Sequence, residues 1–553
     1  MTAPTPHPAR DAATAPQTQD AHASRVPIRR VFVSVFDKSG LEHLAAAFRE
    51  SGVAVASTGG TRTALQALGL EVEDVSEITG FPEVLDGRVK TLHPKIFAGL
   101  LARRDRTDDA EVLAEHGIDL FDAVIVSLYP FERAAADAAM PPAEAIELID
   151  IGGPSLLRAA AKNHAFTSVI SSATQYADLV EAVAAGGFTL AQRRKLAAEA
   201  IAHTAAYDTM IASWLANYAA DTPPAEAADD SPLPARLSLD LEQRMSLRYG
   251  ENPHQAAAFY APAGTHGGLA GLRQLSGKEL SYNNLKDLDA AVRLAGLVAD
   301  PTAIVVKHTN PCGAAAADSV AAALAAAMQA DPTSAFGSIV AVNHPFDVEA
   351  AEILLAPGLF VEVIAAPSFD PKAVELLTTK PTWRASVRLV EIPAGNAWAA
   401  TAGLELTSVA GGLLAQRPDD QADDPSTWKL ATSVSVPAHL AAPLEFAFTM
   451  VRRLSSNAIA VCQGTSLVGA GIGQTSRVDA VRHSLEKAGD RARGGVLASD
   501  AFFPFPDSIA LASAAGIAAI VQPGGSKRDP EVIAAAEEAG IPMVLTGRRH
   551  FRH

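Results

Sequence analysis

Cysteine is almost absent from this chain of 553 residues, which contains only Cys312 and Cys462. Two thiols cannot build a disulfide framework or a four-thiolate zinc site, and such a low number is typical of proteins of the reducing cytoplasm. Long apolar runs are also missing, because no stretch approaches the length of a membrane span, about 18 apolar residues. We therefore expect a soluble cytoplasmic protein without a membrane partner.

An excess of positive charge is lacking as well, since 45 Lys and Arg stand against 62 Asp and Glu, a net charge of −17. Duplex nucleic acid requires a cationic surface, so nucleic acid is not an expected partner. A small anionic ligand needs only a local basic cluster. Residues 88–104 supply five Lys or Arg and no acid. A solvated charged face is the plain alternative, but the glycine and histidine among these charges favour a binding role.

The N-terminal part of the chain divides into a leader and an α/β domain. Residues 1–26 are rich in Pro, Ala, Thr and His without an apolar core, so we expect a disordered leader. Short apolar runs then alternate with helical stretches, which predicts βαβ units and a doubly wound parallel sheet. Further strands are expected at Ala123–Leu128 and Ser168–Ser171, followed by a helix over Thr189–Tyr218. The first domain should cover residues 27–218.

A linker and a second domain are expected in the rest of the chain. Residues 219–236 are rich in Pro, Ala and Asp and show no periodicity, as in an exposed linker. Residues 237–553 again mix apolar strands with Ala-rich helices, which predicts a second α/β domain or a pair of subdomains. No fixed-period repeat is visible.

Three segments of the first domain could bind an anionic substrate. The turns SVFDKSG (34–40) and STGGT (57–61) each end a strand and begin a helix, where unpaired backbone N–H groups face anions. Either turn alone is ordinary turn chemistry, but on neighbouring parallel strands they predict one phosphate pocket. The run IDIGGPSLLRAAAKNH (149–164) places Asp150 before a helix whose N-terminus could stabilise an oxyanion. A capped surface helix is the simple alternative.

In the second domain, the run AIVVKHTNPCG (303–313) places Lys307 and His308 at the end of a buried strand. Catalytic groups gather at such ends in α/β folds, although single His and Lys residues there are usually structural. His can act as a general base near neutral pH, and Lys can polarise a carbonyl group. A zinc deaminase would need a C-x-x-C motif, which this chain lacks, so we expect no catalytic metal.

The ordered motifs resemble the bifunctional AICAR transformylase/IMP cyclohydrolase family of purine biosynthesis. The resemblance spans about residues 27–553 and rests on SVFDKSG, STGGT, ITGFPEVLDGRVKTLHPKIFAGLLAR, SLYPF, IDIGGPSLLRAAAKNH, LRYGENPHQ, VKHTNPCG, DPTSAFG, SSNAIAV, GIGQTSR and SDAFFPF. It implies a methylglyoxal-synthase-like cyclohydrolase domain and a transformylase domain of two cytidine-deaminase-like subdomains without zinc. It further implies formyl transfer from 10-formyltetrahydrofolate to AICAR, closure of the product FAICAR to IMP, and a homodimer with transformylase sites at the subunit interface.

The resemblance also implies a set of residues for the cyclohydrolase site. Lys162 would be the acid–base group of ring closure, with Lys90, Tyr129 and Asp150 positioning the substrate and stabilising the oxyanion. Ser127 stands where the family usually has Asn, and is a shorter hydrogen-bonding side chain. The substrate-binding residues would be Ser34, Phe36, Asp37, Lys38, Thr58, Gly59, Gly60, Thr61, Arg88, Val89, Thr91, Ser127, Leu128, Ile151 and Gly152.

For the transformylase site, the resemblance makes His308 the proton acceptor for the AICAR amine. Lys307 would stabilise the tetrahedral oxyanion and help N10 of the folate to leave. The nucleotide-binding residues would be Arg248, Tyr249, Asn284, Phe336, Gly337, Arg477, Arg549 and Phe551. The residues near the folate and the reacting groups would be Asn457, Asp500, Glu362, Gly495, Ala519 and Ile520.

Two alternatives remain open at this point. The first domain could be a regulatory phosphate-binding module attached to a transformylase of single activity. Against this, a binding module would not need Asp150, Lys162 and Lys90 beside its phosphate turns. The enzyme could also use a one-carbon donor other than folate, which an assay with substituted donors would reveal.

Overall fold

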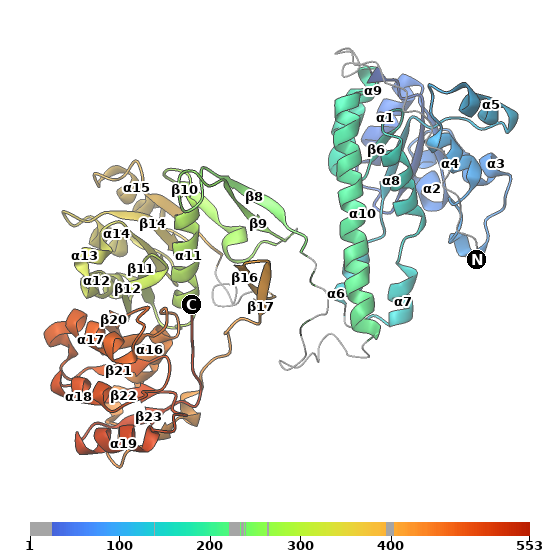
Figure 1. Cartoon of the computed structure of the whole chain (residues 1–553). Helices are drawn as coiled ribbons and strands as arrows, with labels where there is room; N and C mark the ends of the chain where they lie inside the picture. Colours follow the sequence, from blue (N-terminus) through green and yellow to red (C-terminus); the bar gives the residue numbers. More distant parts are fainter. Residues whose placement is uncertain are drawn as a thin grey trace. The chain divides into compact units, whose positions relative to one another are not determined.

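The computed structural model describes residues 25–137, 139–219, 233, 237, 239–262, 265–393 and 403–553. The chain forms two compact units, Met1–Ser238 and Leu239–His553, each with its own hydrophobic core (Figure 1). Within the described ranges, no helix combines the length and apolar composition that a membrane crossing needs. Most of the expected leader and linker lies outside these ranges.

The last two residues of the expected leader belong to a strand of the first unit. Arg25 and Val26 form strand β1 (Arg25–Val26), which pairs antiparallel with β7 (Phe188–Thr189). Its backbone N–H and C=O groups are therefore satisfied within the first unit, and the ordered chain begins before residue 27.

A five-stranded parallel sheet, with the order β4-β3-β2-β5-β6, forms the centre of the first unit. The apolar runs form its strands because helices cover both faces of the sheet. The order reverses at β2, so the carboxyl ends of β2 and β5 flank a topological switch point, where open α/β sheets bind ligands. The strands are β2 (Arg30–Val35), β3 (Ala54–Ser57), β4 (Val72–Asp74), β5 (Ala123–Ser127) and β6 (Ser168–Ile170).

Helices pack on this sheet in two groups. One group is α1 (Leu41–Ser51) with α9 (Tyr176–Ala184), and the other is α8 (Gly152–Lys162) with α4 (Pro94–Leu101) and α10 (Leu190–Ala219) (Figure 1). The predicted strands and the long helix are thus confirmed, with bounds shifted by at most one residue. The other elements are α2 (Gly59–Ala67), α3 (Val75–Thr79), η2 (Leu85–Gly87), α5 (Thr107–Glu115), α6 (Phe131–Ala136), α7 (Pro142–Glu147) and η3 (Ala173–Gln175).

A mixed twelve-stranded sheet forms the centre of the second unit, with the order β10-β15-β14-β13-β11-β12-β20-β19-β21-β22-β23-β18. Its strands are β10 (Arg273–Ser276), β11 (Thr302–Lys307), β12 (Asn310–Ala316), β13 (Ser338–Val342), β14 (Val361–Ala366), β15 (Arg388–Glu391), β18 (Lys429–Leu430), β19 (Ile459–Gln463), β20 (Ser466–Gly471), β21 (Val496–Ser499), β22 (Ala519–Gln522) and β23 (Met543–Leu545). The helices are α11 (Tyr282–Ala295), α12 (Val320–Ala330), α13 (Pro332–Ala335), α14 (Val348–Leu354), α15 (Pro371–Thr379), α16 (Ala441–Val451), α17 (Arg477–Ala488), α18 (Asp507–Ala514) and α19 (Asp529–Glu538), with short η4 (Gly268–Gly271), η5 (Pro425–Thr427), η6 (Ala438–Leu440) and η7 (Gly489–Ala492).

This sheet consists of two halves with the same strand pairing, joined where β12 pairs antiparallel with β20. Each half begins, at the junction, with a hairpin whose strand register shifts once. The shift follows Val305 in the hairpin β11–β12 and Val461 in the hairpin β19–β20. Two parallel pairings and one antiparallel edge strand then follow in both halves. The expected pair of subdomains is therefore present, although the sequence shows no repeat.

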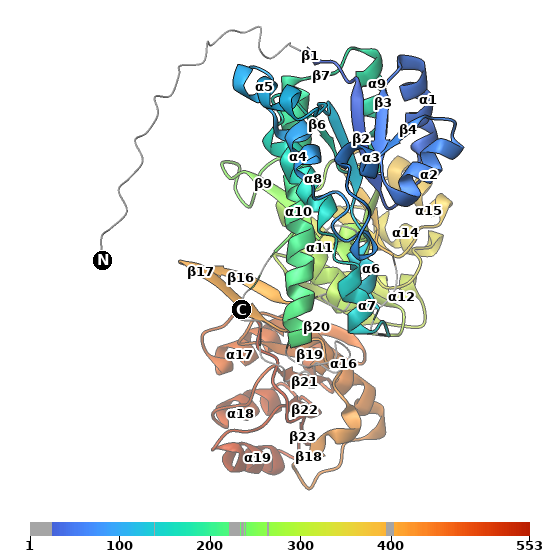
Figure 2. The ribbon, with the colours of Figure 1, turned by 90° about the vertical axis from the view of Figure 1, so that its right-hand side faces the viewer.

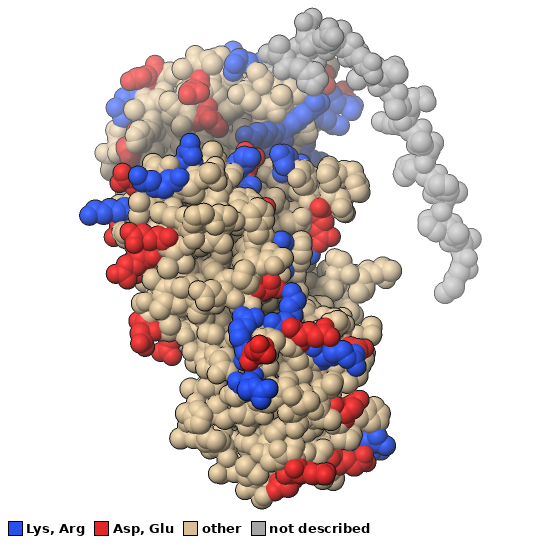
Figure 3. Space-filling view, turned by 90° about the vertical axis from the view of Figure 1, so that its left-hand side faces the viewer, with Lys and Arg blue, Asp and Glu red and all other residues tan. Residues whose placement is uncertain are grey.

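Two hairpins lie outside the large sheet of the second unit. They are β8–β9 (Glu242–Leu247 and Ala257–Ala261) and β16–β17 (Glu405–Val409 and Gly412–Gln416), and the latter projects from the second unit in Figure 2. On the face shown in Figure 3, Lys and Arg side chains are interspersed with Asp and Glu side chains.

Candidate active sites

The turn after β2 forms the first part of a site at the switch point of the parallel sheet. The Lys38 ammonium group donates to the Phe36 carbonyl oxygen at 3.1 Å, to Thr61 Oγ1 at 3.2 Å and to the Val35 carbonyl oxygen. Burial lowers the pKa of Lys38, which Asp37 offsets only in part. Lys38 therefore joins the end of β2 to the first turn of α2, and holds a cation beside both predicted phosphate turns.

Ser127, the residue that departs from the family motif, shapes the same turn. Its Oγ accepts hydrogen bonds from the backbone N–H groups of Phe36 at 2.7 Å and Asp37 at 3.3 Å. Asp37 in turn accepts from the N–H and hydroxyl of Ser39, which lowers the Asp37 pKa. In this structure the short Ser side chain holds the loop backbone.

The N-terminus of α2 forms the second part of the site. Gly59 begins this helix, and the preceding Thr58 makes no side-chain cap, so the first N–H groups remain available to an anion. Lys90 lies beside this terminus, because a Cβ atom on Gly59 would be 3.2 Å from Lys90 Nζ. Lys90 also pairs with Glu83, at 2.6 Å. The structure thus brings the predicted phosphate turn and Lys90 together.

Asp150 forms the third part, at the start of α8. Its Oδ1 accepts from the Gly153 N–H at 2.8 Å, and its own N–H donates to Tyr207 Oη at 2.9 Å. Burial raises the pKa of Asp150, and backbone hydrogen bonds from Gly153, Gly152 and Tyr129 oppose that rise. Burial also raises the pKa of Tyr129, and the nearby Asp150 carboxylate adds to it. The site thus has an acid that holds its proton more tightly than an exposed Asp.

Contacts between aromatic and small residues join these parts. The rings of Phe36 and Tyr129 meet edge to face at 5.6 Å. Thr91 lies against Gly152, since a Cβ atom there would be 2.5 Å from Thr91 Oγ1. One cluster therefore contains most of the predicted cyclohydrolase residues.

Other predicted residues of this site lie at its margin or away from it. Lys162 ends α8, ten residues after Gly152, which places the two Cα atoms about 15 Å apart along the helix axis. Its side chain is exposed, and its acid–base role stays a prediction. Ser34 lies within β2, Leu128 is buried in the core, Val89 and Ile151 are exposed, and Arg88 pairs with Glu147.

In the second unit, Lys307 and His308 occupy the turn of the β11–β12 hairpin. Both turn residues, His308 and Thr309, have positive φ angles, of 56° and 62°; among the described non-glycine residues only Leu85 shares this. Asp287 of α11 holds the turn by accepting from the N–H groups of His308 at 3.2 Å and Thr309 at 2.6 Å. The His308 ring is exposed at the tip, as a proton acceptor for a substrate requires.

Four further predicted residues form two contacts near the start of β13 and β14. Lys307 Nζ donates to the Phe336 carbonyl oxygen at 3.0 Å, while the Phe336 ring remains 54% exposed. Gly337 follows with a φ of 74°, where only glycine is unstrained. Asn284 of α11 donates to Glu362 Oε2 at 3.0 Å, which places a predicted nucleotide residue against a predicted folate residue.

A buried polar network lies at the same end of the sheet, contributed by the second half. Arg477 donates to Asn457 Oδ1 at 2.8 Å and to the Ala458 carbonyl oxygen at 3.0 Å, and pairs with Asp500. The network connects with the turn through the N–H of Ser455, which donates to Asn310 Oδ1 at 2.9 Å. Arg477 and Asp500 are almost fully buried, so they position Asn457 and the neighbouring backbone.

Two exposed Arg–aromatic pairs complete the predicted nucleotide residues. The Arg549 guanidinium lies 4.8 Å from the centre of the Phe551 ring in the C-terminal segment. The Arg248 guanidinium lies 4.7 Å from the centre of the Tyr249 ring, after β8. Both pairs offer a planar cation and a ring to a ligand with a phosphate and a heterocycle.

The predicted folate residues Gly495, Ala519 and Ile520 do not join this cluster of side chains, and their role stays a prediction. Gly495 precedes β21, whereas Asp500 follows the same strand, so the two lie at opposite ends of the sheet. Ala519 and Ile520 are fully buried in β22, and their side chains contribute to the core. Sequence reasoning missed the exposed rings of Phe502 and Phe505, which follow Asp500 in the loop SDAFFPF. The Arg528 guanidinium lies 4.8 Å from the centre of the Phe505 ring.

A cavity of about 200 Å³ lies beside the catalytic pair, lined by Lys307, His308, Cys312 and residues of β20. Burial raises the pKa of the Cys312 thiol to about 11, so the thiol stays protonated and is not a nucleophile. Lys487 and Asp331 close one side with an ion pair of 2.6 Å. Within the described ranges, no group of three or more His, Cys, Asp or Glu is arranged to hold a metal ion.

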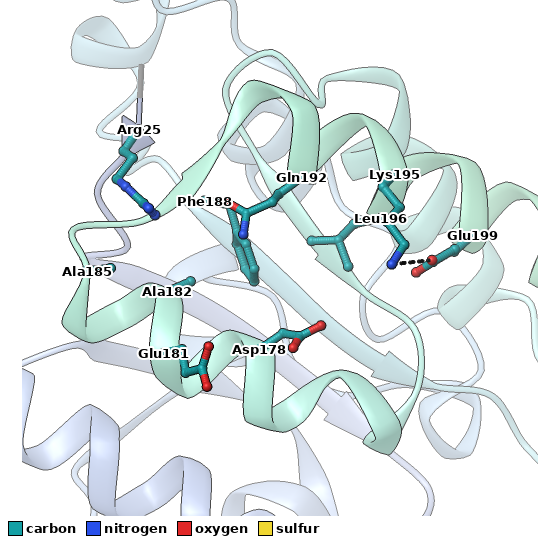
Figure 4. A pocket seen from close by; sticks show the side chains of 10 residues that line it. All are labelled: Arg25, Asp178, Glu181, Ala182, Ala185, Phe188, Gln192, Lys195, Leu196 and Glu199. Atoms are coloured by element: carbon teal, nitrogen blue, oxygen red, sulfur yellow. Dashed lines mark ion pairs between the residues drawn. The ribbon is translucent and has the colours of Figure 1, made fainter. Parts of the chain in front are cut away.

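A pocket of about 220 Å³ in the first unit lies apart from these sites (Figure 4). Helix α9, strand β7 and the start of α10 line it, with an ion pair of 3.7 Å between Lys195 and Glu199. None of the residues predicted for catalysis lines this pocket.

The chain is similar to two family models and to known proteins over nearly its whole length. Residues 160–487 match the family model described as AICARFT/IMPCHase bienzyme, and residues 40–155 match the MGS-like domain. The chain is 49% identical over 530 residues to the bifunctional purine biosynthesis protein PurH of Rhodopirellula baltica, covering 96% of this chain and 99% of that protein. It is 46% identical over 534 residues to the protein of the same name from Cutibacterium acnes, covering 96% and 100%. A crystal structure of ForH is 34% identical, with a TM-score of 0.31, over 34% of this chain and 96% of that chain.

Proposed function

The chain belongs to the AICARFT/IMPCHase bienzyme family, and we propose that the two sites described above each perform one of its reactions. The enzyme transfers a formyl group from 10-formyltetrahydrofolate to AICAR and closes the product, FAICAR, to IMP. The exposed turn that presents Lys307 and His308 carries the assignment of formyl transfer to the second unit. The alternative of a purely regulatory first unit is not favoured, because bifunctional relatives match 96% of this chain.

In formyl transfer, His308 takes the proton that the AICAR amine loses as its nitrogen bonds to the formyl carbon. The amine is weakly nucleophilic because its lone pair is conjugated with the imidazole ring, so a base at this position lowers the barrier. Lys307 stabilises the oxyanion of the tetrahedral intermediate. It also supplies a proton to N10 of the folate as the carbon–nitrogen bond to N10 breaks.

In ring closure, the first unit contributes mainly position. The carboxamide nitrogen of FAICAR already lies next to the formyl carbon, so holding both groups in contact supplies much of the rate enhancement. The α2 N-terminus, Lys38 and Lys90 hold the phosphate. Asp150, whose pKa is raised by burial, and Tyr129 face the closing ring and assist the proton transfers that accompany loss of water.

Two substitutions separate the sites. We expect His308→Ala to abolish formyl transfer while cyclisation of supplied FAICAR continues, because the two sites are built from different units. Lys162→Ala tests the acid–base role that the resemblance implies: in that role the variant loses cyclisation and keeps formyl transfer, although Lys162 lies at the end of α8 away from Gly152. The measurement is IMP formation from AICAR with 10-formyltetrahydrofolate, beside IMP formation from FAICAR. Equal loss of both reactions in either variant would reject the assignment.

We further propose that the enzyme works as a homodimer in the cytoplasm. The exposed apolar side chains of the β16–β17 hairpin support a dimer, since an isolated two-stranded sheet is marginally stable in water. They are Leu406, Val409, Leu413 and Leu414. The mass in solution, measured by light scattering, tests this proposal: a monomer at assay concentration would contradict it.

A further inference from the structure

The C-terminal segment Arg548–His553 forms no helix or strand, yet it lies against the transformylase residues. Its side chains alternate: His550 is 1% exposed and Arg552 is half-buried, whereas Arg549 and Phe551 are exposed. An extended backbone sends successive side chains to opposite sides. His550 and Arg552 therefore anchor the segment. Arg549 and Phe551, the two predicted nucleotide residues, face outward.

The anchor at His550 is held by two carboxylates. Its Nδ1 lies 2.6 Å from Asp419 Oδ2, and its Nε2 lies 3.1 Å from Asp423 Oδ1. The ring also meets Phe448 edge to face at 5.4 Å. An ionised carboxylate only accepts hydrogen bonds, so both ring nitrogens must donate. His550 is therefore an imidazolium in this arrangement.

The charges around His550 are balanced by Arg452 at the end of α16. Arg452 is 4% exposed and pairs with the same two carboxylates, at 3.1 Å to Asp419 and 3.5 Å to Asp423. Arg548 lies 4.0 Å from Asp423, and Arg453 donates to the Asp419 carbonyl oxygen at 3.4 Å. Burial alone would lower the pKa of His550, but the hydrogen bonds to both carboxylates outweigh it and raise the pKa.

The anchored segment is fastened to both halves of the candidate site. The His550 N–H donates to the Asp500 carbonyl oxygen at 3.0 Å. The Arg552 N–H donates to Ser456 Oγ at 3.1 Å, and its guanidinium donates to the Thr309 carbonyl oxygen at 3.0 Å. The segment thus spans from the buried Asp500 network to the turn that carries His308.

We propose that His550, clamped between Asp419 and Asp423, is a positioning residue that sets Arg549 and Phe551 for nucleotide binding at the transformylase site. The inference rests on the proposed function of the second unit. His550 does not touch the reacting atoms, so its effect falls on the affinity for AICAR rather than on the chemical step. Without the clamp, the two presented side chains lose a fixed position, and binding must then order the segment.

The test is His550→Gln in the full chain, with steady-state formyl transfer measured against AICAR and 10-formyltetrahydrofolate separately. We expect the KM for AICAR to rise roughly tenfold, with kcat and the folate KM changed by less than about threefold, since the neutral Gln removes the positive charge that lies between the Asp419 and Asp423 carboxylates. His439→Gln, the same change at an exposed histidine of the second unit, is the matched control and should match the wild type. The double variant Asp423→Asn/His550→Gln should recover part of the AICAR affinity, because it leaves one carboxylate, Asp419, to pair with Arg452.

A pH series supplies an independent measurement on the unmodified enzyme. The KM for AICAR should rise as pH increases through the raised pKa of His550, and the Asp423→Asn variant should shift that rise to lower pH. An unchanged AICAR KM in His550→Gln, or a loss that falls on kcat or on the folate KM, overturns the proposal. If His550→Gln does not fold, the pH series decides: a flat AICAR KM overturns it. A wild-type enzyme that makes no FAICAR would instead refute the proposed function.

Discussion

Asp500 offers the sharpest test of how the second unit holds its site, because it forms a buried ion pair with Arg477. The Asp500 side chain is fully buried and that of Arg477 is 5% exposed. Asp500 also accepts from the Ala458 N–H at 3.2 Å and from the Ser456 hydroxyl. Asp500→Asn keeps the shape of the side chain and removes its charge.

The expected loss follows from this burial. Breaking a buried ion pair costs about 3–5 kcal/mol, because the remaining charge has lost its partner in a site without water. Asn can still accept from Arg477 and Ala458, so we expect the lower end, about 3 kcal/mol, for Asp500→Asn. Asp500→Ala also leaves the Ala458 N–H without its side-chain acceptor, which adds about 1–3 kcal/mol. The free energy of unfolding should therefore decrease in the order wild type, Asp500→Asn, Asp500→Ala, as a consequence of the hydrogen bonds that each variant retains.

Denaturant unfolding of the full chain measures these losses in the free energy of unfolding. Cyclisation of FAICAR serves as a control signal, because it reports on the first unit, which carries no substitution. A double-mutant cycle with Arg477→Met should give a coupling energy of about 2–3 kcal/mol, since the single variants each leave one buried charge. The formyl-transfer rate should fall with stability, because Arg477 also positions Asn457. Losses below about 1 kcal/mol in both single variants, or purely additive losses, would refute the reasoning.

Three further predictions concern single groups. Gly153→Ala should slow FAICAR cyclisation and leave formyl transfer unchanged, because a Cβ atom at residue 153 would lie 2.3 Å from Asp150 Oδ2 and displace that carboxylate. A normal rate of cyclisation would contradict the proposed role of Asp150. The affinity of the first unit for IMP should weaken at a lower pH than the deprotonation of an exposed lysine would produce, since burial lowers the pKa of Lys38. The Lys38→Arg variant should keep its affinity to higher pH in the same titration. The stabilisation that His550 contributes should be complete below the pKa of His in the unfolded chain, about 6.5, and should be lost as pH rises through the raised pKa of the folded state. Alkaline pH should therefore lower the unfolding midpoint of the second unit in the wild type but not in His550→Gln.

The fold of the first unit could be predicted because its signals are local. The alternation of apolar runs with helical stretches gives a parallel sheet, and the glycine turns mark the ends of β2 and β3. Lys38 comes from a motif that follows the end of β2, and Asp150 from a motif that precedes helix α8. What the sequence did not show is which contacts are made. Ser127 supports the backbone of the neighbouring turn, and Lys162 lies at the far end of α8.

The second unit was less predictable because its site depends on contacts between distant segments. Asp419 and Asp423 carry no motif, yet they hold His550 across more than a hundred residues of sequence. Ala519 and Ile520 were expected at the folate, but the strand that carries them lies at the centre of one half-sheet and is buried on both faces. Burial of this kind follows from strand order, and strand order here reflects pairings that no local pattern encodes.

The two halves of the large sheet differ at the turn where the first half carries Lys307-His308. The turn that corresponds to Lys307-His308 in the second half is Gln463-Gly464, and Gly464 adopts a φ of 55° without strain. His308 and Thr309 adopt the same left-handed region at a cost of about 1–3 kcal/mol each. The two hydrogen bonds to Asp287 offset part of that cost. Strained turns persist most often at functional sites, so the histidine in place of glycine supports the proposal that the first half carries the formyl-transfer residues.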